Sequence, residues 1–304
     1  MRQVCSLIGI LMALLTADAV RGGEKTETVY EEILRTLKRH WLYELDEREA
    51  RTCASIKKLM ILPNCFGKDS YMSLRYTDHG SAREKETTAV TALQLEIMPP
   101  PELEKDAAFV KISMTHGVPH EYEVDNYFSP KFESLRDTRV AGYYIDLNGN
   151  LGGYTTGAAT FLKYFAPLSK TEQLLFELRG RNERAADTHR FIATQSGIAA
   201  GSCIAVLVNK NTASAAEIIA YVLQLWGARI VGEPTYKKGT AQTTFSLSDG
   251  AQFTFTTGKI YYVDGATTHQ RGVTPDFIAN DEHTQHKEAL RYLGECNAEK
   301  ASRP

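Results

Sequence analysis

The sequence of 304 residues has no internal repeat, no low-complexity segment and no long apolar run after its first twenty residues. It also has no cluster of lysines and arginines, and its formal net charge is -2. Because nucleic-acid phosphates are bound by clustered basic side chains, we do not expect a nucleic acid as the main partner. The length is enough to bury a substantial core, in one large domain or two modest ones.

Two common signatures of catalytic sites are missing as well. The five cysteines and eight histidines do not form closely spaced pairs that recur, so the spacing does not indicate a zinc site. There is also no G-x-S-x-G motif, the sharp turn that carries the serine of many hydrolases. These absences exclude the most familiar serine and zinc sites.

The first twenty residues have the pattern of a targeting signal. Arg2 precedes an apolar run from Val4 to Leu15, and the small-x-small sequence Ala17-Asp18-Ala19 follows it. The run is too short to span a bilayer comfortably, so we expect residues 1–19 to be a cleaved signal peptide, with an uncleaved membrane anchor as the alternative. The mature chain is then expected to have no membrane span and to be secreted or periplasmic.

Loss of Cys5 with the signal would leave four cysteines in an oxidising compartment, which permits up to two disulfides in three connectivities. Cys53 and Cys65 are the favoured pair, because they would close a short loop. Cys203 lies in an apolar strand, where we expect a buried free thiol at least as readily as a disulfide.

Hydrophobic periodicity predicts a mixed N-terminal region over residues 24–106. Apolar residues recur every three to four positions from Val29 to Leu45, which predicts an amphipathic helix that starts near Glu24 and continues, after a break, to about Leu62. Residues 90–97 alternate like a strand, and the polar, proline-rich segment 99–106 forms a stiff connection. We place a domain boundary at this connection.

Beyond the boundary, predicted strands alternate with predicted helices. The strands cover 108–114, 142–147, 174–178 and 203–209, and the helices cover 129–139, 155–166 and 213–226. Such alternation implies crossover connections and a largely parallel sheet. Residues 229–262 are rich in β-formers and contain a hairpin signal at Asp249-Gly250. The charged segment 176–191 is expected to be a solvated face rather than a loop beside the cleft.

Ser214 lies in the segment NTASAAEI (211–218), between an apolar strand and an apolar helix. A serine hydroxyl is a poor nucleophile until a base takes its proton, and no histidine here stands in a recognisable triad context. Lys238, in GEPTYKKGTAQ (232–242), is a candidate base, because burial lowers the pKa of a lysine and leaves a neutral amine. Taken alone, however, Ser214 is typical of a helix N-cap and Lys238 of a solvated loop.

Four motifs in this order resemble the carboxyl-terminal processing proteases, the S41 family of serine peptidases with a serine-lysine dyad. They are DLNGNLGG (146–153), TASAAEI (212–218), GEPTYKKGTAQ (232–242) and GVTPD (272–276). The resemblance implies an S41-like peptidase domain over 107–296, followed by a tail at 297–304. It also implies an α/β fold of the crotonase/ClpP-like spiral type, with a mostly parallel sheet, an N-terminal helical region and a C-terminal β-rich segment.

The resemblance also implies roles for the matched residues. Ser214 corresponds to the nucleophile, Lys238 to the general base and Gln242 to the residue that positions the lysine. The backbone N–H groups of Ala215 and Gly152 correspond to the oxyanion hole, in which Gly153 is an almost equal alternative to Gly152. A glycine suits this turn because a Cβ atom could block the substrate's approach to the backbone. Three acidic residues are expected to be structural: Asp146, Glu217 and Asp276.

The chain departs from the family pattern at several positions. Lys237 stands where a glycine usually precedes the catalytic lysine, and Asn148 stands where an arginine is usual. Only about 45 residues separate Leu62 from Ala107, which is too few for the PDZ domain with which most members capture the substrate's C-terminus. We therefore do not expect capture of substrates by a PDZ domain.

From these residues we predict a serine endopeptidase with a Ser-Lys dyad that cleaves protein or peptide substrates, with cleavage near their C-termini as one option. It would need no metal and no organic cofactor. The alternative is a catalytically inactive S41-like module that binds peptides or apolar ligands. A crotonase-type acyl-CoA enzyme is disfavoured by the predicted signal peptide. The oligomeric state stays open.

Overall fold

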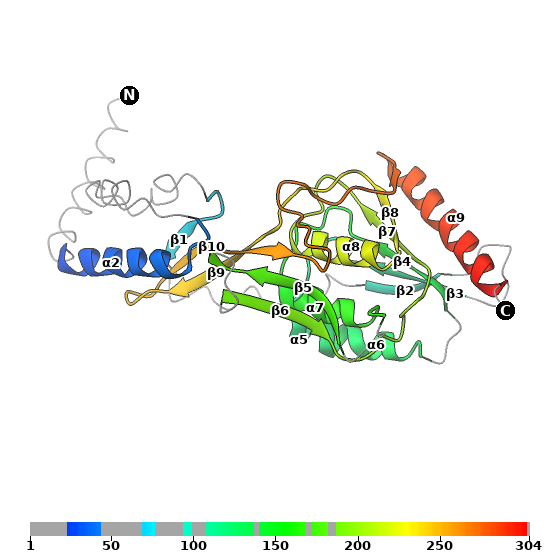
Figure 1. Ribbon diagram of the computed structural model, residues 1–304, viewed down its shortest axis with the longest axis horizontal. Helices are drawn as coiled ribbons and strands as arrows, with labels where there is room; N and C mark the ends of the chain where they lie inside the picture. Colours follow the sequence, from blue (N-terminus) through cyan, green and yellow to red (C-terminus); the bar gives the residue numbers. More distant parts are fainter. Residues whose placement is uncertain are drawn as a thin grey trace, which may run out of the picture. The chain divides into compact units, whose positions relative to one another are not determined.

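Figure 1 shows the computed structural model of the chain. The structure describes residues 23–43, 69–76, 94–98, 108–136, 140–167, 172–181 and 187–302. The predicted signal peptide, the Cys53–Cys65 pair, the later part of the first helix and the connection at 99–106 lie outside these residues.

The chain divides into two compact units that interleave along the sequence. The small unit comprises Met1–Ala82, Gly180–Asn182 and Gln242–Thr257, and the large unit comprises Arg83–Arg179, Glu183–Ala241 and Gly258–Pro304. Each unit has buried hydrophobic residues that form a core of its own.

The small unit combines one helix with antiparallel strands. Helix α2 (Gly23–His40) carries the predicted apolar stripe, and Ile33, Leu37 and Trp41 are almost completely buried. Strand β1 (Ser73–Tyr76) pairs with the first residues of β10 (Ala251–Tyr261), with Ser73 opposite Thr254. The stripe packs with buried residues of these strands and their turn, which include Met72, Leu247, Phe253 and Phe255. The predicted amphipathic helix is therefore confirmed as far as His40.

Strands β9 (Thr240–Ser246) and β10 form the predicted hairpin. The amide of Leu247 donates to the carbonyl of Ala251 at 2.9 Å, and the amide of Gly250 donates to the carbonyl of Leu247 at the same distance. Gly250 has a φ of +86°, which a glycine adopts without steric cost. This turn chemistry explains why the Asp249-Gly250 signal located the hairpin correctly.

The large unit is built on a six-stranded sheet in the order β11-β8-β7-β4-β3-β2. Its strands are β2 (Gln94–Met98), β3 (Ala108–Ser113), β4 (Val140–Asp146), β7 (Ile204–Val208), β8 (Arg229–Gly232) and β11 (Phe277–Ile278). Neighbours from β3 to β11 are parallel, and β2 pairs with β3 antiparallel. The predicted α/β fold with a mostly parallel sheet is confirmed.

The central strands are buried on both faces, because helices cover each side. On one face, inward side chains pack with α7 (Thr155–Lys163) and α8 (Ala215–Leu225); on the other face, they pack with α9 (Glu282–Ala301). Alternate residues therefore serve different layers: Tyr143, Ile145 and Val206 belong to the first core, and Tyr144, Ala205 and Leu207 to the second. This two-sided burial explains the uninterrupted apolar run of β7.

The helix predicted at 129–139 has wrong bounds. The helical segment begins with α5 (Glu121–Glu123), continues as the π-helix η2 (Val124–Phe128) and ends as α6 (Ser129–Glu133). His120 caps its start: its Nδ1 atom accepts the amide of Tyr122 at 3.2 Å, while the carboxylate of Glu123 accepts the amide of His120 at 2.9 Å. This reciprocal capping box, with histidine in place of serine, fixes the early start.

Two further expectations are corrected by the large unit, and one is refined. The segment 176–191 contains the ends of two antiparallel strands, β5 (Gln173–Arg179) and β6 (Thr188–Ala193), and among its described residues Asp187, His189 and Arg190 are exposed. Helix α9 extends to Ala301, into the expected tail. Cys203 is not a free thiol, because it forms a disulfide with Cys296 of α9, with 6.0 Å between the Cα atoms. No helix in the part of the chain that the structure describes could cross a bilayer.

Candidate active site

Apart from Gln242, the predicted site residues follow the carboxyl ends of neighbouring parallel strands in the large unit. The amide of Leu147, after β4, donates to the carbonyl of Leu207 at 3.0 Å, and the amide of Glu233, after β8, donates to the carbonyl of Val208 at 3.1 Å. The loops after β4, β7 and β8 therefore start side by side. This edge of an open α/β sheet is where ligands usually bind.

Thr212 joins these three loops. Its buried hydroxyl donates to the carbonyl of Leu147 and accepts the amide of Asn209, both at 2.9 Å. Its carbonyl accepts the amide of Tyr236 at 2.9 Å. The segment just before Ser214 is thus fixed from three directions.

Ser214 is the N-cap residue of α8 and has a φ of +56° and a ψ of -120°. A residue with a side chain adopts this backbone conformation at a steric cost and keeps it only where the surrounding contacts impose it. The side chain is half-buried, and its neighbours Ala213 and Ala215 are buried. The chain therefore forms a sharp, strained strand-to-helix turn at this serine without a G-x-S-x-G sequence.

The carboxylate of Glu217 connects the serine turn to the lysine loop. Its Oε2 atom accepts the amides of Ser214 and Lys238, each at 2.8 Å, so the two backbones are adjacent. Its Oε1 atom accepts the hydroxyl of Thr235 at 2.5 Å and the amide of Lys237 at 2.8 Å. Burial raises the pKa of Glu217 above its ordinary value, although these four donors act in the opposite direction. The expected structural role is thus a bridge between two predicted catalytic residues.

Within the lysine loop, Lys238 is half-buried and Lys237 is exposed. Lys237 has a φ of +78°, the left-handed conformation that favours glycine. The loop therefore keeps, with a lysine, the backbone conformation that a glycine would adopt there. Gly239 packs so closely that a Cβ atom would lie 2.2 Å from the backbone nitrogen of His269.

His269 is a titratable group beside this loop that the sequence analysis did not single out. Its Nδ1 atom is buried and has no hydrogen-bond partner among the residues that the structure describes. Burial, together with the positive charge of Lys259, lowers the pKa of His269. A neutral imidazole near the lysine must therefore be tested as an alternative base.

The turn that contains Gly152 lies against the serine. A Cβ atom on Gly152, which has a φ of +95°, would lie 2.6 Å from the Cβ of Ser214 and 3.0 Å from the amide nitrogen of Ala215. The amide of Gly152 donates to Oδ1 of Asn150 at 2.9 Å. The amides of Ala215 and Gly153, by contrast, have no acceptor within the described part of the chain.

Asn150 holds this turn in place, a role that the sequence analysis missed. Its completely buried side chain donates to the carbonyl of Met114 at 2.6 Å and accepts the amide of Gly152. Its carbonyl accepts the amide of Ala213 at 2.8 Å. Asn150 therefore connects the end of β3 to both the glycine turn and the residue before Ser214.

Gln242 belongs to the small unit. Its Nε2 atom donates to the hydroxyl of Thr256 on β10 at 3.1 Å. Three residues of chain separate Gln242 from Lys238.

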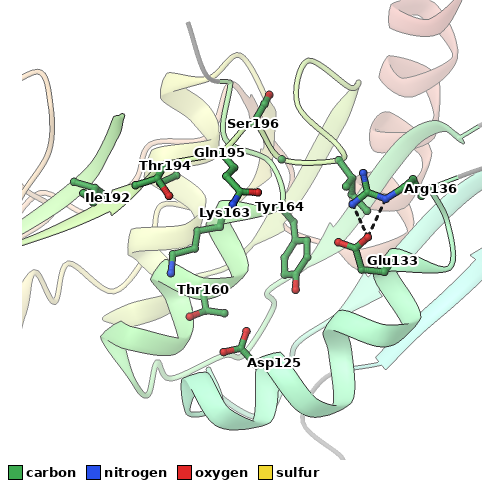
Figure 2. Close-up of a pocket in the computed structure, with 13 residues that line it drawn as sticks. Asp125, Glu133, Arg136, Thr160, Lys163, Tyr164, Ile192, Thr194, Gln195 and Ser196 are labelled. Atoms are coloured by element: carbon green, nitrogen blue, oxygen red, sulfur yellow. Dashed lines mark hydrogen bonds and ion pairs between the residues drawn. The ribbon is translucent and has the colours of Figure 1, made fainter. Parts of the chain in front are cut away.

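A separate polar pocket of about 460 Å³ lies elsewhere in the large unit (Figure 2). Its wall includes Asp125 of η2, Thr160 and Lys163 of α7, and the loop after β6, and the ion pair between Glu133 and Arg136 (2.6 Å) lies at one end. None of the predicted site residues lines it. Among the described residues, no group of three histidines, cysteines or acidic side chains could hold a metal ion.

A serine on a strained turn at a helix N-terminus, next to two unoccupied amides and a lysine loop, is the arrangement of a serine hydrolase. The model of peptidase family S41 matches residues 106–279, which is more than half of the chain. The chain therefore belongs to peptidase family S41.

The relatives agree with this family. The carboxy-terminal processing protease CtpA of Bacillus subtilis is 32% identical over 149 residues, and the chloroplastic carboxyl-terminal-processing peptidase 2 of Arabidopsis thaliana is 34% identical over 145 residues. These alignments cover 48% and 47% of this chain but only 30% and 27% of the relatives, so the chain spans less than a third of their length.

Solved structures show the same fold. A lipoprotein from Streptococcus agalactiae superimposes with a TM-score of 0.64 at 17% identity, over 89% of this chain and 96% of that one. A photosystem II D1 C-terminal processing protease superimposes with a TM-score of 0.50 at 22% identity, over 67% of this chain and 52% of that one. At these identities the likeness concerns the fold alone.

Proposed function

We propose that the chain is a serine endopeptidase in which Ser214 is the nucleophile, Lys238 the general base and Gln242 the residue that positions the lysine. The observation that carries the proposal is the Glu217 carboxylate, which holds the amides of Ser214 and Lys238 on one oxygen. Burying a carboxylate costs free energy unless hydrogen-bond donors satisfy it, and here four donors do so. Two of these donors are the backbone amides of the residues whose side chains would react.

The reaction follows from these roles. The neutral amine of Lys238 takes the proton of the Ser214 hydroxyl as the oxygen attacks a peptide carbonyl, and the resulting ammonium then protonates the departing amine. Water attacks the acyl-enzyme by the same route in reverse, releases the new carboxylate and restores the free hydroxyl. The residues need no metal and no organic cofactor for this chemistry.

The oxyanion is held by backbone amides beside the serine. Ala215 at the start of α8 is one donor, and Gly152 or Gly153 is the other. The amide of Gly152 already donates to Asn150, whereas the amide of Gly153 has no acceptor among the described residues, which favours Gly153 in this state of the turn. Gly152 keeps a second function, because its missing side chain leaves room for Ser214.

The substrates are proteins or peptides. Large apolar side chains stand exposed around the turn: Leu151 is 70% exposed, Tyr154 57% and Tyr236 56%. Exposed apolar surface beside a reactive group is typical of a binding site. Several relatives are named as processing proteases of carboxyl termini, so we propose cleavage near a C-terminus as one mode. Action after secretion, outside the cell or in a periplasm, remains part of the proposal.

The test uses the mature chain with casein and with short peptides that end in a free carboxylate or an amide. Ser214→Ala and Lys238→Met should each lower kcat by several orders of magnitude, up to about a million-fold. Lys237→Met is the matched control, because it removes the exposed neighbour, and it should keep most of the activity. Dependence of cleavage on a free carboxylate would support C-terminal specificity.

Two outcomes would reject parts of this proposal. Cleavage by Ser214→Ala at the parental rate would exclude the serine mechanism, and complete inactivity of the parent on every peptide would favour the binding-module alternative. If His269→Gln abolishes cleavage while Lys238→Met retains it, the base is the imidazole and the dyad is wrong.

A further inference from the structure

The hydroxyl of Thr235 lies between two hydrogen-bonding groups of the large unit, and the residue is only 3% exposed. The hydroxyl donates to Oε1 of Glu217 at 2.5 Å and accepts the amide of Val273 at 2.7 Å. The amide of Thr235 also donates to the carbonyl of Val273 at 3.2 Å. Thr235 therefore connects the bridging carboxylate of the site to the segment GVTPD (272–276).

These contacts leave the Thr235 hydroxyl one orientation. A backbone amide only donates and an ionised carboxylate only accepts, so the hydroxyl hydrogen is directed at Glu217 and the hydroxyl oxygen at the amide of Val273. Of the hydrogen bonds that Glu217 accepts, the one from Thr235 lowers the pKa of Glu217 most, against the rise that burial causes. The hydroxyl thus favours the ionised carboxylate, which has acceptor sites for all four of its donors.

The hydroxyl also fixes the carboxylate in space. Oε1 of Glu217 is held by the hydroxyl of Thr235 and the amide of Lys237, while Oε2 accepts the amides of Ser214 and Lys238. Because a carboxylate is rigid and planar, the position of Oε1 determines where Oε2 can lie. Without the hydroxyl, Oε1 would be held by a single amide, and the distance between the two backbones on Oε2 would be less well defined.

The segment 272–276 supports Thr235 because it is itself anchored to the core. Asp276 exchanges two hydrogen bonds with Ile230 of β8: its amide donates to the carbonyl and its Oδ2 atom accepts the amide, both at 2.8 Å. Its Oδ1 atom accepts Nε2 of Gln224, on α8, at 3.2 Å. Val273 is 1% exposed. The amide that holds the Thr235 hydroxyl therefore belongs to a segment tied to both the sheet and a helix.

We propose that Thr235 is a positioning residue for catalysis: its hydroxyl, held by the amide of Val273, sets the Glu217 carboxylate that keeps the backbones of Ser214 and Lys238 together. This inference rests on the proposed function, which gives Ser214 and Lys238 their roles. It gives the segment 272–276 a part in the reaction, as the support of the residue that orients the bridge. Each of these contacts lies within the large unit.

The decisive variant is Thr235→Val, which removes the hydroxyl with little change of shape. We expect kcat to fall about 10- to 100-fold, because a displacement of about 1 Å between reacting groups can cost about 100-fold. KM should change less than about twofold, because the variant leaves the exposed substrate-binding side chains in place. Thr235→Ser retains the hydroxyl and should keep most of kcat.

A serine-reactive phosphonate gives a second readout. This small reagent modifies an activated serine and makes few contacts with the rest of a peptide site, so its rate reports the alignment of nucleophile and base. The rate of modification should fall in Thr235→Val by about the same factor as kcat and stay near the parental value in Thr235→Ser. If the valine variant does not fold, Thr235→Ala makes the same test without placing a methyl group against the carboxylate.

Tyr144→Phe is the control for general loosening of the large unit. It also removes a buried hydroxyl, which lies 3.1 Å from Nδ1 of His286, but this hydroxyl belongs to the core on the other face of the sheet from α8. Urea unfolding should show a loss of stability in both variants, whereas kcat should fall only in Thr235→Val. An equal fall of kcat in Tyr144→Phe would overturn the proposal.

A double-mutant cycle locates the effect. In the Glu217→Gln background, Thr235→Val should lower kcat little further, because the carboxylate through which the hydroxyl acts is gone. The proposal is overturned if the two effects multiply, if Thr235→Val leaves kcat unchanged, or if Thr235→Ser is as slow as Thr235→Val. Failure of the proposed function gives a different result, because Ser214→Ala would then cleave as well as the parent.

Discussion

At the scale of single residues, Gly152 packs so closely against Ser214 that it has no room for a side chain. Gly152 has a φ of +95°, and a methyl group on it would overlap the Cβ of Ser214 and the carbonyl oxygen of Ala213. Gly149 in the same loop also has a positive φ, +73°, but nothing lies within 4 Å of its missing Cβ. Substitution of either glycine would strain the backbone, but only substitution of Gly152 would also displace Ser214. Comparing the two variants therefore distinguishes these two effects.

We predict that Gly152→Ala abolishes most peptidase activity and that Gly149→Ala does not. Both variants place a side chain at positive φ, which lowers the free energy of unfolding by about 1–2 kcal/mol. Only Gly152→Ala must also move Ser214 away from its position. Urea unfolding and kcat/KM on one peptide would check both effects. Equal activity in the two variants would contradict the close packing.

The site motifs could be predicted from the sequence, but the contacts that hold them could not. The sequence placed Ser214 and Lys238 through their motifs, and the structure brings their amides to one oxygen. The bridging role of Glu217, the buried contacts of Asn150 and the orphaned imidazole of His269 depend on residues far apart in the chain. No local pattern distinguishes them from ordinary capping or turn residues.

At the scale of elements, hydrophobic periodicity predicted the helices and strands whose buried residues follow a regular pattern along the sequence. The apolar run of β7 and the stripe of α2 were identified because two-sided burial and one-sided burial leave clear patterns. Strand β6 was missed, since His189 and Arg190 are exposed and interrupt its apolar residues. Helix α9 was missed because few of its residues are buried: mainly Gln285, Glu288, Ala289 and Leu293.

The Cys203–Cys296 disulfide compensates for this small apolar face. It ties α9 to the residue before β7, across a sequence separation of 93 residues. Closing so long a loop restricts the unfolded chain and stabilises the folded one by about 2–5 kcal/mol. A covalent tie of this kind is useful where a helix covers a sheet with few large side chains.

We therefore predict that the double variant Cys203→Ala and Cys296→Ala unfolds at a lower temperature than the parent, by several degrees or more. A reductant should lower the melting temperature of the parent more than that of the variant, because the variant lacks this bond. Thermal unfolding followed by circular dichroism, with and without dithiothreitol, would measure the difference. Identical sensitivity to the reductant would show that the bond does not stabilise the large unit.

At the scale of the whole molecule, chain order and spatial organisation differ. The small unit takes residues from the N-terminal region and from the hairpin at Gln242–Thr257, so the contacts divide the chain at other positions than residue 106, where the match to the family model begins. Sequence patterns report neighbours along the chain, whereas the cores join segments such as α2 and β10 that lie about 200 residues apart. Interleaving of this kind cannot be inferred from periodicity.

Two consecutive tyrosines of β4, Tyr143 and Tyr144, are buried on opposite faces of the sheet in the large unit. Tyr143 packs between the rings of Phe132 and Phe165, each with ring centroids 5.4 Å away, and the hydroxyl of Tyr144 lies 3.1 Å from Nδ1 of His286. Burial raises the pKa of Tyr143 to about 12, and burial also raises the pKa of Tyr144.

This shift predicts that the free energy of unfolding falls as the pH rises above about 10. In that range the unfolded chain releases the tyrosine proton and the folded chain retains it, so the unfolded state binds fewer protons and alkali favours it. For Tyr143 the full contribution is about 3 kcal/mol, present below its ordinary pKa and lost as the pH passes the folded value. Tyr143→Phe should reduce the decrease between about pH 8 and about pH 11 in urea unfolding. Tyr127→Phe, at an exposed position, should behave like the parent. If Tyr143→Phe loses as much stability in alkali as the parent, the phenol does not titrate as a buried group, and another residue governs alkaline unfolding.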